Sequence, residues 1–468
     1  MIGPLRLVLA ASLLGLPLAG CSDLPAGSLP PARVPSGAMQ PLPAMKSFAA
    51  ASPEPARRSN RDMARDFLDL SFELESGRSL PVMTRFEGPI RVRLTGDVPK
   101  GMAGELENVL GRMRSEAKLD IGRTDSADAQ VTIQAVSGDE IRRFLPQAAC
   151  FVVPNITSLK EYPSARRKGL TDWAQLTTRE HMAIFVPADV APQEMRDCLH
   201  EELAQSLGPL NDLYRLPDSV FNDDNIHTVL TGFDMLMLRV TYAPELHSGM
   251  TRGEVAAVLP GILRRINPAG EAKAYAGLPS TPRDWIDAVQ EALGPGAAAG
   301  ARQRAGQKVL QIAEREGWRD HRLAFSLYVY GRLVQGSDPT SARAAFETAR
   351  EICARSPETR IHGAFSSAQL AAHALTRGDG QRALDYLQGQ PELALQYQNA
   401  ALLSSLLMLR AEALDQLNRP QEAATVRLDS LGWARYGFGP DYAVREKLGE
   451  IAALSPQTVT RAAQPVTP

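Results

Sequence analysis

The stretch DCLHEELAQSLGPLND, residues 197–212, contains most of a helix and the point where that helix ends. Pro192 suits the first turn of a helix and Gly208 suits its end, because proline is favoured in the first turn and glycine just after the last turn. At 100° per residue, Glu202 falls on the apolar face. The pattern predicts a helix over residues 192–208 in which Glu202 faces the core or a cleft within it.

The segments before this helix alternate between strand and helix patterns. Four segments have the alternating or continuously apolar pattern of strands: residues 88–96, 129–136, 148–154 and 181–189. Residues 101–117 carry apolar side chains spaced as on one face of a helix. We therefore predict an α+β domain over residues 63–268, with a mixed sheet and the 192–208 helix packed into one layer.

Within this helix the residues are spaced like the zinc motif of metalloproteases, H-E-x-x-H-x-x-G-x-x-H. His200 is out of frame, because the residue one turn later is Ala204. A frame shifted by one residue fits all five motif positions, which are then Glu201, Glu202, Gln205, Gly208 and Asn211. The three ligand positions thus hold Glu201, Gln205 and Asn211, while Glu202 keeps the position of the catalytic glutamate.

Two later segments extend this resemblance. Ser219-Val220-Phe221 resembles the Ser-x-Met turn that underlies zinc in metzincins, with Phe221 in the methionine position. LTGFDMLMLRVTY, residues 230–242, resembles the closing helix of matrix-type metalloproteases. The motifs follow one another in the metalloprotease order, so the resemblance implies a zincin-like fold with a degenerate zinc motif.

Longer runs resemble a second family. CLHEELAQSLGPLNDLYRLPDSVFNDDN and LTGFDMLMLRVTYAPELHSGMTRGEV are similar to the bacterial domain of unknown function 2927 family, which is found in secreted and lipid-anchored proteins. This second resemblance supports the predicted fold and leaves the function open.

The altered ligand positions change the chemistry that the motif can support. Zinc prefers imidazole, thiolate and carboxylate ligands, whereas glutamine and asparagine offer neutral oxygens. Glu201, Gln205 and Asn211, with Asp212 nearby, would suit calcium or magnesium rather than zinc. Such an ion activates water less than zinc does, so Glu202 as general base would lack its usual nucleophile. The alternative role of Gln205 and Asn211 is hydrogen bonding to the helix end and the following loop.

Other titratable residues give weaker signals. Glu201 and Glu202 could be the acid and base of a glycosidase, but no aromatic sugar platform is evident beside them. His181, His227 and His247 have no ligand partner at helical or turn spacing. We expect these three histidines in loops or on the surface.

The N-terminal residues have the pattern of a secretory signal, with Arg6 followed by an apolar run from Leu7 to Leu18. The run leads into Leu-Ala-Gly-Cys, which resembles a bacterial lipobox with Cys21 as the lipidated residue; an ordinary cleaved signal is the alternative. Ser22, where lipoproteins retained in the inner membrane usually have Asp, implies an outer-membrane location facing the periplasm. No later apolar run could span a bilayer. Lipidated Cys21 would therefore be the only membrane attachment.

Three other cysteines would then lie in an oxidising compartment, where disulfides form. We predict a disulfide between Cys150 and Cys198, which leaves Cys353 as a buried thiol. A metal-bound thiolate at Cys198 is the alternative.

The remaining segments differ in composition. Residues 22–62 are rich in Pro, Ala and Ser without periodicity, which predicts a disordered tether. Residues 269–300 are expected to form a linker and residues 441–468 a C-terminal tail.

Residues 301–440 are rich in Ala, Leu, Arg and Gln at helical spacing. Ala344, Ala383 and Ala423 follow Gly, Asn or Pro turns about every 40 residues, which resembles lengthened tetratricopeptide repeats. A plain helical bundle is the alternative. Such a stack offers a groove for a protein or peptide.

Composition limits the partners. The net charge is −2 and basic clusters are absent, so nothing supports nucleic-acid binding. The sequence favours a non-catalytic, periplasm-facing lipoprotein whose two folded parts bind an envelope protein or peptide without a cofactor. The alternative is a metal-assisted peptide hydrolase, with Glu202 as base and Glu201, Gln205 and Asn211 holding the ion.

Overall fold

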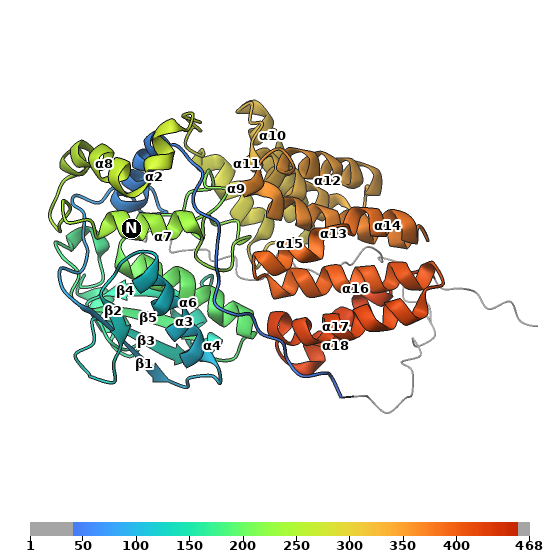
Figure 1. Ribbon diagram of the computed structural model, residues 1–468, viewed down its shortest axis with the longest axis horizontal. Coiled ribbons are helices and arrows are strands. Elements are labelled where there is room, and N and C mark those ends of the chain that lie inside the picture. Colours follow the sequence, from blue (N-terminus) through green and yellow to red (C-terminus); the bar gives the residue numbers. More distant parts are fainter. Residues whose placement is uncertain (1–40, 457–468) are drawn as a thin grey trace, which may run out of the picture.

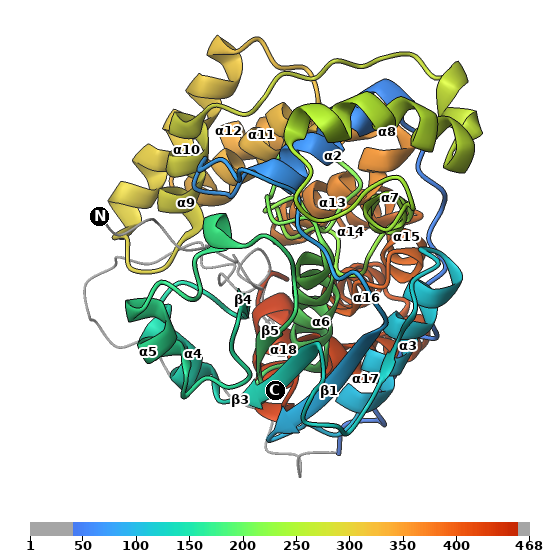
Figure 2. The same cartoon turned by 90° about the vertical axis from the view of Figure 1, so that its left-hand side faces the viewer.

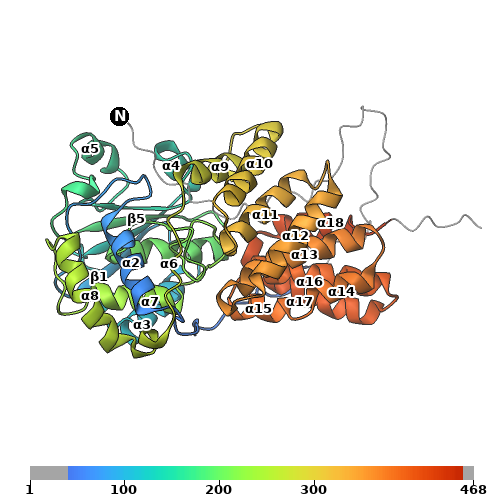
Figure 3. The ribbon, with the colours of Figure 1, turned by 90° about the horizontal axis from the view of Figure 1, so that it is seen from above.

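The structure is a computed structural model that describes residues 41–456 (Figure 1). An α/β domain occupies one end of the molecule and a helix-rich region occupies the other, as Figure 3 shows from above. This arrangement confirms the predicted domain with a mixed sheet followed by a helical region, whereas the zincin-like character of the predicted α+β domain stays a prediction.

The α/β domain contains one five-stranded sheet with the order β2-β1-β3-β5-β4. Its strands are β1 (Ile90–Gly96), β2 (Ile121–Arg123), β3 (Val131–Val136), β4 (Phe151–Pro154) and β5 (Met182–Pro187). The edge strand β4 is antiparallel to β5, and the other pairs are parallel. All four predicted strands are present. The sequence did not reveal β2, because three residues are too few for a periodic pattern.

Helices cover this sheet and extend the domain. They are α2 (Asn60–Phe72), α3 (Met102–Ser115), α4 (Gly138–Phe144), α5 (Tyr162–Arg167), α6 (Pro192–Leu207), α7 (Gly232–Thr241) and α8 (Arg252–Ile266), with short 3₁₀ turns η1 (Trp173–Gln175) and η2 (Pro268–Ala272). Pro192 begins α6 and Gly208 is its C-cap residue, as predicted. Helix α6 packs against α3, β4 and β5, so its position is set by the sheet.

The helix-rich region begins earlier and ends later than the sequence suggested. It contains α9 (Arg283–Leu293), α10 (Ala299–Arg315), α11 (His321–Val334), α12 (Pro339–Cys353), η3 (Pro357–Thr359), α13 (Arg360–Thr376), α14 (Gly380–Leu387), α15 (Gln390–Gln396), α16 (Ala400–Gln416), α17 (Pro420–Phe438) and α18 (Asp441–Ala452). The predicted linker includes α9, which buries Trp285, and the predicted tail includes α18, which buries Val444 and Ile451. The predicted linker and tail were therefore wrong at α9 and α18. These helices bury apolar residues only when they pack against the other helices, so their sequences alone do not indicate folded segments.

Consecutive helices from α9 to α13 pack against each other, and α16 packs against α14, α15 and α17. The three recurrent segments begin α12, α14 and α17. Ala342, Ala383 and Ala423 each lie four residues after the N-cap residue and are fully buried. Ala344 is exposed, so the predicted register of the first segment was wrong by two residues.

Residues 41–59, here called the strap, lie extended across the molecule without helix or strand. The backbone N–H of Lys46 donates to the carbonyl of Gly432 over 3.0 Å, and Phe48 stacks on Trp433 with 4.6 Å between ring centroids. The strap then leads into α2 and so joins both parts of the protein (Figure 1). This part of the predicted disordered tether is therefore bound to the folded protein. Its hydrogen bonds and single aromatic contacts require no periodic pattern in the sequence.

Cys21 and the predicted signal lie outside the described residues. Within residues 41–456, every helix is either too short or too polar to cross a lipid bilayer.

The strap crosses the first residue of α7 so closely that only glycine fits there. A Cβ at Gly232 would overlap the carbonyl oxygen of Glu54. We expect Gly232→Ala to lower the free energy of unfolding in urea by about 1–3 kcal/mol, because overpacking forces the backbone to move, and to increase hydrogen exchange in the strap. Gly253, in the first turn of α8, has open space around it. Gly253→Ala is expected to be neutral or slightly stabilising, and equal losses for the two variants would contradict this contact.

Candidate functional site

Helix α6 lies between the sheet and the helical region (Figure 2), and its far side contacts α17. One face of α6 is buried in the core of the α/β domain, where Leu199 and Leu203 are completely enclosed. The opposite face therefore meets the boundary between the two parts of the protein.

The residues at the positions of the zinc-like motif have different surroundings in the structure. Glu202 and Gln205 are completely buried. Asn211 is also buried; its Nδ2 donates to the carbonyl of Asp69 over 3.1 Å, and its Oδ1 accepts from the backbone N–H of Asp212 over 3.0 Å. Glu201 differs from these three residues, because it lines a cavity. The side chain of Asn211 thus forms hydrogen bonds with backbone groups, which is the alternative role considered for it in the sequence.

Within residues 41–456, no group of three or more His, Cys, Asp or Glu side chains has an arrangement that could hold a metal ion. The buried position of Glu202 also separates it from the cavity that Glu201 lines. The motif residues therefore differ in their surroundings, and the predicted binding of an ion by Glu201, Gln205 and Asn211 stays a prediction.

His200 has a structural role, in which it connects two segments of the α/β domain. It is buried, and its Nδ1 accepts a hydrogen bond from the backbone N–H of Leu230 over 3.2 Å. Burial lowers its pKa well below the usual value, so the ring is neutral. His200 thereby joins α6 to the segment before α7. His181 and His247 are exposed, as expected.

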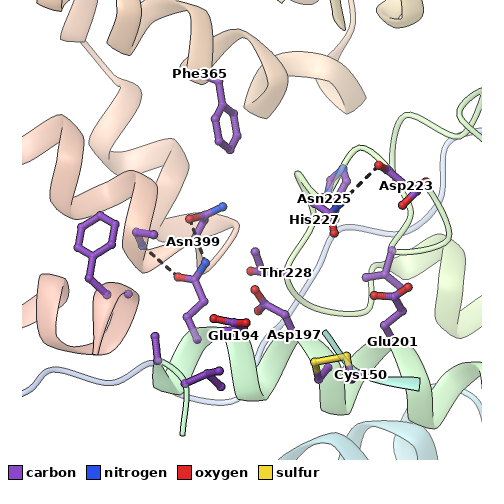
Figure 4. Close-up of a pocket in the computed structure, with 18 of the residues that line it drawn as sticks. Cys150, Glu194, Asp197, Glu201, Asp223, Asn225, His227, Thr228, Phe365 and Asn399 are labelled. Atoms are coloured by element: carbon purple, nitrogen blue, oxygen red, sulfur yellow. Dashed lines mark hydrogen bonds between the residues drawn. A yellow bond between two sulfur atoms is a disulfide. The ribbon is translucent and has the colours of Figure 1, made fainter. Parts of the chain in front are cut away.

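A cavity of about 370 Å³ opens over the outer face of α6 (Figure 4). Glu194, Asp197 and Glu201 line it from α6, and Asp223 lines it from the loop on the other side. The helical region completes the wall, with contributions from Phe365, Asn399, Ala401, Phe438 and Tyr442. Among the described residues, the lining includes neither lysine nor arginine.

Two carboxyl groups in this cavity, those of Asp197 and Asp223, are costly to ionise. Burial raises the pKa of Asp197 well above its usual value, and the charge of Glu194 adds to the shift. Burial also raises the pKa of Asp223, with further contributions from the charges of Glu75 and Glu201. A positive group within the cavity would favour the ionised forms.

The predicted Cys150–Cys198 disulfide is confirmed, and both cysteines line the cavity. It connects the residue before β4 to α6, so the acidic face is attached covalently to the sheet edge. The bond excludes the alternative of a metal-bound thiolate at Cys198. Cys353 is a buried free thiol, as predicted, and burial raises its pKa to about 12.

Three histidines meet beside the cavity, where the loop before α7 contacts α11 and α13. The Nε2 atoms of His227 and His362 both lie 2.9 Å from the carbonyl oxygen of Pro217, and Nε2 of His321 lies 2.8 Å from that of Tyr214. Burial lowers the pKa of all three, that of His321 to about 4. His227 is thus in a loop, as predicted, but it is enclosed between the two parts of the protein.

Asp224 is buried against this cluster, with Oδ2 3.5 Å from Nδ1 of His362. Burial raises the pKa of Asp224 to about 8. Nε2 of His362 donates to a carbonyl, which leaves Nδ1 as an acceptor, so a protonated Asp224 suits this contact. Between its unfolded pKa, about 4, and its folded pKa, the folded state binds the extra proton. The stability that this proton provides is therefore lost as the pH rises towards 8.

We expect the free energy of unfolding to fall between pH 6 and pH 9 more steeply in the wild type than in Asp224→Asn. The difference should be at most about 1.4 kcal/mol per pH unit, and urea denaturation at each pH measures it. Asp128→Asn, an exposed position in the loop before β3, is the control and should keep the wild-type slope. The other titrating groups are common to all three proteins and cancel in the comparison. Equal slopes for all three would contradict a protonated Asp224.

Sequence reasoning missed most of the cavity residues. Glu194, Asp197 and Glu201 are separated by three and four residues, the spacing that aligns side chains on one helix face. That pattern is present in the sequence, where it overlaps the zinc-like motif at Glu201. Asp223 has no comparable signal, because only the folding of its loop brings it opposite α6.

A search of curated proteins and a search of solved structures gave no match to the chain. A family model does match part of it, in agreement with the resemblance noted in the sequence. The matched segment begins with α2, includes the sheet, α6 and α7, and ends within α8. Residues 60–261, which hold one wall of the acidic cavity, match the family described as Protein of unknown function (DUF2927).

Proposed function

We propose that this protein is a non-catalytic binding protein in which the α/β domain and the helical region hold a protein or peptide partner between them. The carrying observation is the cavity over α6, whose walls come from both parts and include Glu201 of α6 and Tyr442 of α18. Its volume of about 370 Å³ lies in the range of ligand pockets. Stacked helical hairpins commonly bind peptides, which supports the same role for the helical region.

The position of Glu202 argues against the alternative of a peptide hydrolase. A general base must approach the reacting group within hydrogen-bond distance, directly or through one water. The side chain of Glu202 has no exposed surface and does not line the cavity. A ligand in the cavity would meet Glu201 instead, and Asn211 already bonds to backbone.

The proposal includes a location in the cell envelope, with a lipid on Cys21 as the membrane attachment and the outer membrane as its site. It rests on the lipobox-like sequence. Growth with an alkyne-labelled fatty acid should label the wild-type protein and leave Cys21→Ala unlabelled. Equal labelling of both would contradict lipidation at this residue.

Binding can be tested with three fluorescein-labelled decapeptides that differ in having lysine, serine or glutamate at alternate positions. We expect at least one to raise the fluorescence anisotropy on binding and to remain uncleaved by mass spectrometry. Tyr442→Ala and Glu201→Ala should each weaken binding, because each removes a lining side chain, one from the helical region and one from α6. Leu428→Ala is the matched control, since Leu428 is exposed on α17 and does not line the cavity.

Two results would contradict the proposal. The first is binding of none of the three peptides. The second is cleavage of a peptide by the calcium- or magnesium-loaded protein that is lost in Glu202→Gln, which would instead support a metal-assisted hydrolase.

A further inference from the structure

We propose that the cavity over α6 is a cation site, which takes the ammonium or guanidinium group of a basic side chain in a peptide. This inference rests on the proposed function, because it assumes that a peptide enters the cavity. It adds the chemical class of the ligand, which the shape of the cavity alone does not give.

The first observation is an unsatisfied oxygen at the cavity wall. The Oδ1 atom of Asp197 is buried, and no hydrogen-bond partner for it exists within the described part of the chain. Figure 4 shows the carboxyl group of Asp197 directed from α6 into the cavity, between Glu194 and Thr228. A buried oxygen without a partner destabilises the folded protein, and a donor from a ligand would remove that cost.

The second observation is that neither lysine nor arginine lines the cavity within residues 41–456. Five carboxyl side chains do line it, Glu194, Asp197 and Glu201 from α6 and Asp189 and Asp223 from loops. The charge of the neighbouring Arg196 favours the ionised form of Asp197 and so lowers its pKa. Arg196 does not line the cavity, and its Nη2 donates to the carbonyl of Gln398 over 2.6 Å. An arriving cation would therefore supply the charge that the cavity lacks.

The third observation concerns the kind of cation. The carboxyl groups do not form a cluster that could hold a metal ion, as noted for the described residues. Their charge is spread along α6 and across to the loop. Phe365, Phe438 and Tyr442 form part of the other wall, and aromatic rings attract cations and cover apolar stems. A basic side chain, with a charged end and an apolar stem, matches both walls.

The test compares pentalysine with pentalysine acetylated on every Nε, by isothermal titration calorimetry of the purified protein. Acetylation removes the charges and keeps the backbone. We expect pentalysine to bind at least tenfold more tightly than the acetylated peptide. Asp197→Asn should weaken pentalysine binding about tenfold, whereas Asp128→Asn, which removes an exposed carboxylate outside the cavity, should leave it unchanged. Urea denaturation checks that both variants are folded.

Each other result overturns the inference in a distinct way. Equally tight binding of the acetylated peptide would show that the cavity holds peptides without selecting cations, so the proposed function would remain. Equal weakening by Asp197→Asn and Asp128→Asn would show general attraction to a negative surface. If neither these peptides nor the serine and glutamate decapeptides bind, the proposed function fails together with the inference.

Discussion

Replacing Arg196 by alanine is expected to lower the free energy of unfolding by about 1–3 kcal/mol, because it leaves the carbonyl of Gln398 without its closest hydrogen-bond donor. Arg196 is 2% exposed and extends from α6 into the helical region. Its Nη1 and Nη2 donate to the side chain and the carbonyl of Gln398, over 3.3 and 2.6 Å. Its guanidinium also lies 5.1 Å from the ring of Phe48 in the strap and 5.3 Å from that of Tyr436 in α17.

Arg196 thus contacts three segments that are distant in the sequence, and its loss should affect all of them. Urea denaturation measures the stability, and hydrogen exchange in the strap measures the release of Phe48. Arg143→Ala is the control, because Arg143 is exposed on α4, and its effect should stay within about 0.5 kcal/mol. Similar small effects of both substitutions would contradict the role of Arg196 in joining the two parts.

Reduction of the Cys150–Cys198 disulfide is expected to cost about 4 kcal/mol, the loop-closure value for a sequence separation of 48 residues. The bond holds α6 against the start of β4. Its loss therefore releases the acidic face of the cavity and also removes a constraint on the unfolded chain. Urea denaturation with and without dithiothreitol measures this cost.

The double variant Cys150→Ser, Cys198→Ser provides the control for the disulfide. It should unfold at the lower denaturant concentration of the reduced wild type, and dithiothreitol should not change it further. Cys353→Ala keeps the disulfide and should retain the full response to dithiothreitol, because Cys353 is not bonded. A wild type that is insensitive to reduction would contradict the stabilising role of the bond.

Local signals predicted the elements that depend on neighbouring residues. Pro192 and Gly208 marked the ends of α6, and apolar runs marked four of the strands. The register of the helical segments was less accurate, since Ala342 and Ala344 both follow the same turn and only packing distinguishes the buried one. Periodicity thus located helices and strands but did not determine which small residue was buried.

Features that depend on distant contacts were not predictable from the sequence. The strap has no periodicity, because it is bound by single contacts such as that of Phe48 with Trp433. The cavity requires the helical region to lie over α6, and no motif encodes that docking. The zinc-like motif placed Glu201 and Glu202 in one predicted site, although the side chains of consecutive residues in a helix point about 100° apart. The structure puts Glu201 at the cavity and Glu202 in the core.

The most direct test of the account is the affinity for pentalysine of two neighbouring isosteric variants, Glu201→Gln and Glu202→Gln, measured by isothermal titration calorimetry on folded protein. If binding uses the cavity over α6, Glu201→Gln weakens it about tenfold, whereas Glu202→Gln retains the wild-type affinity. The opposite result, with affinity lost only in Glu202→Gln, would contradict the account. It would place the binding site at Glu202, in the catalytic position of the metalloprotease-like motif.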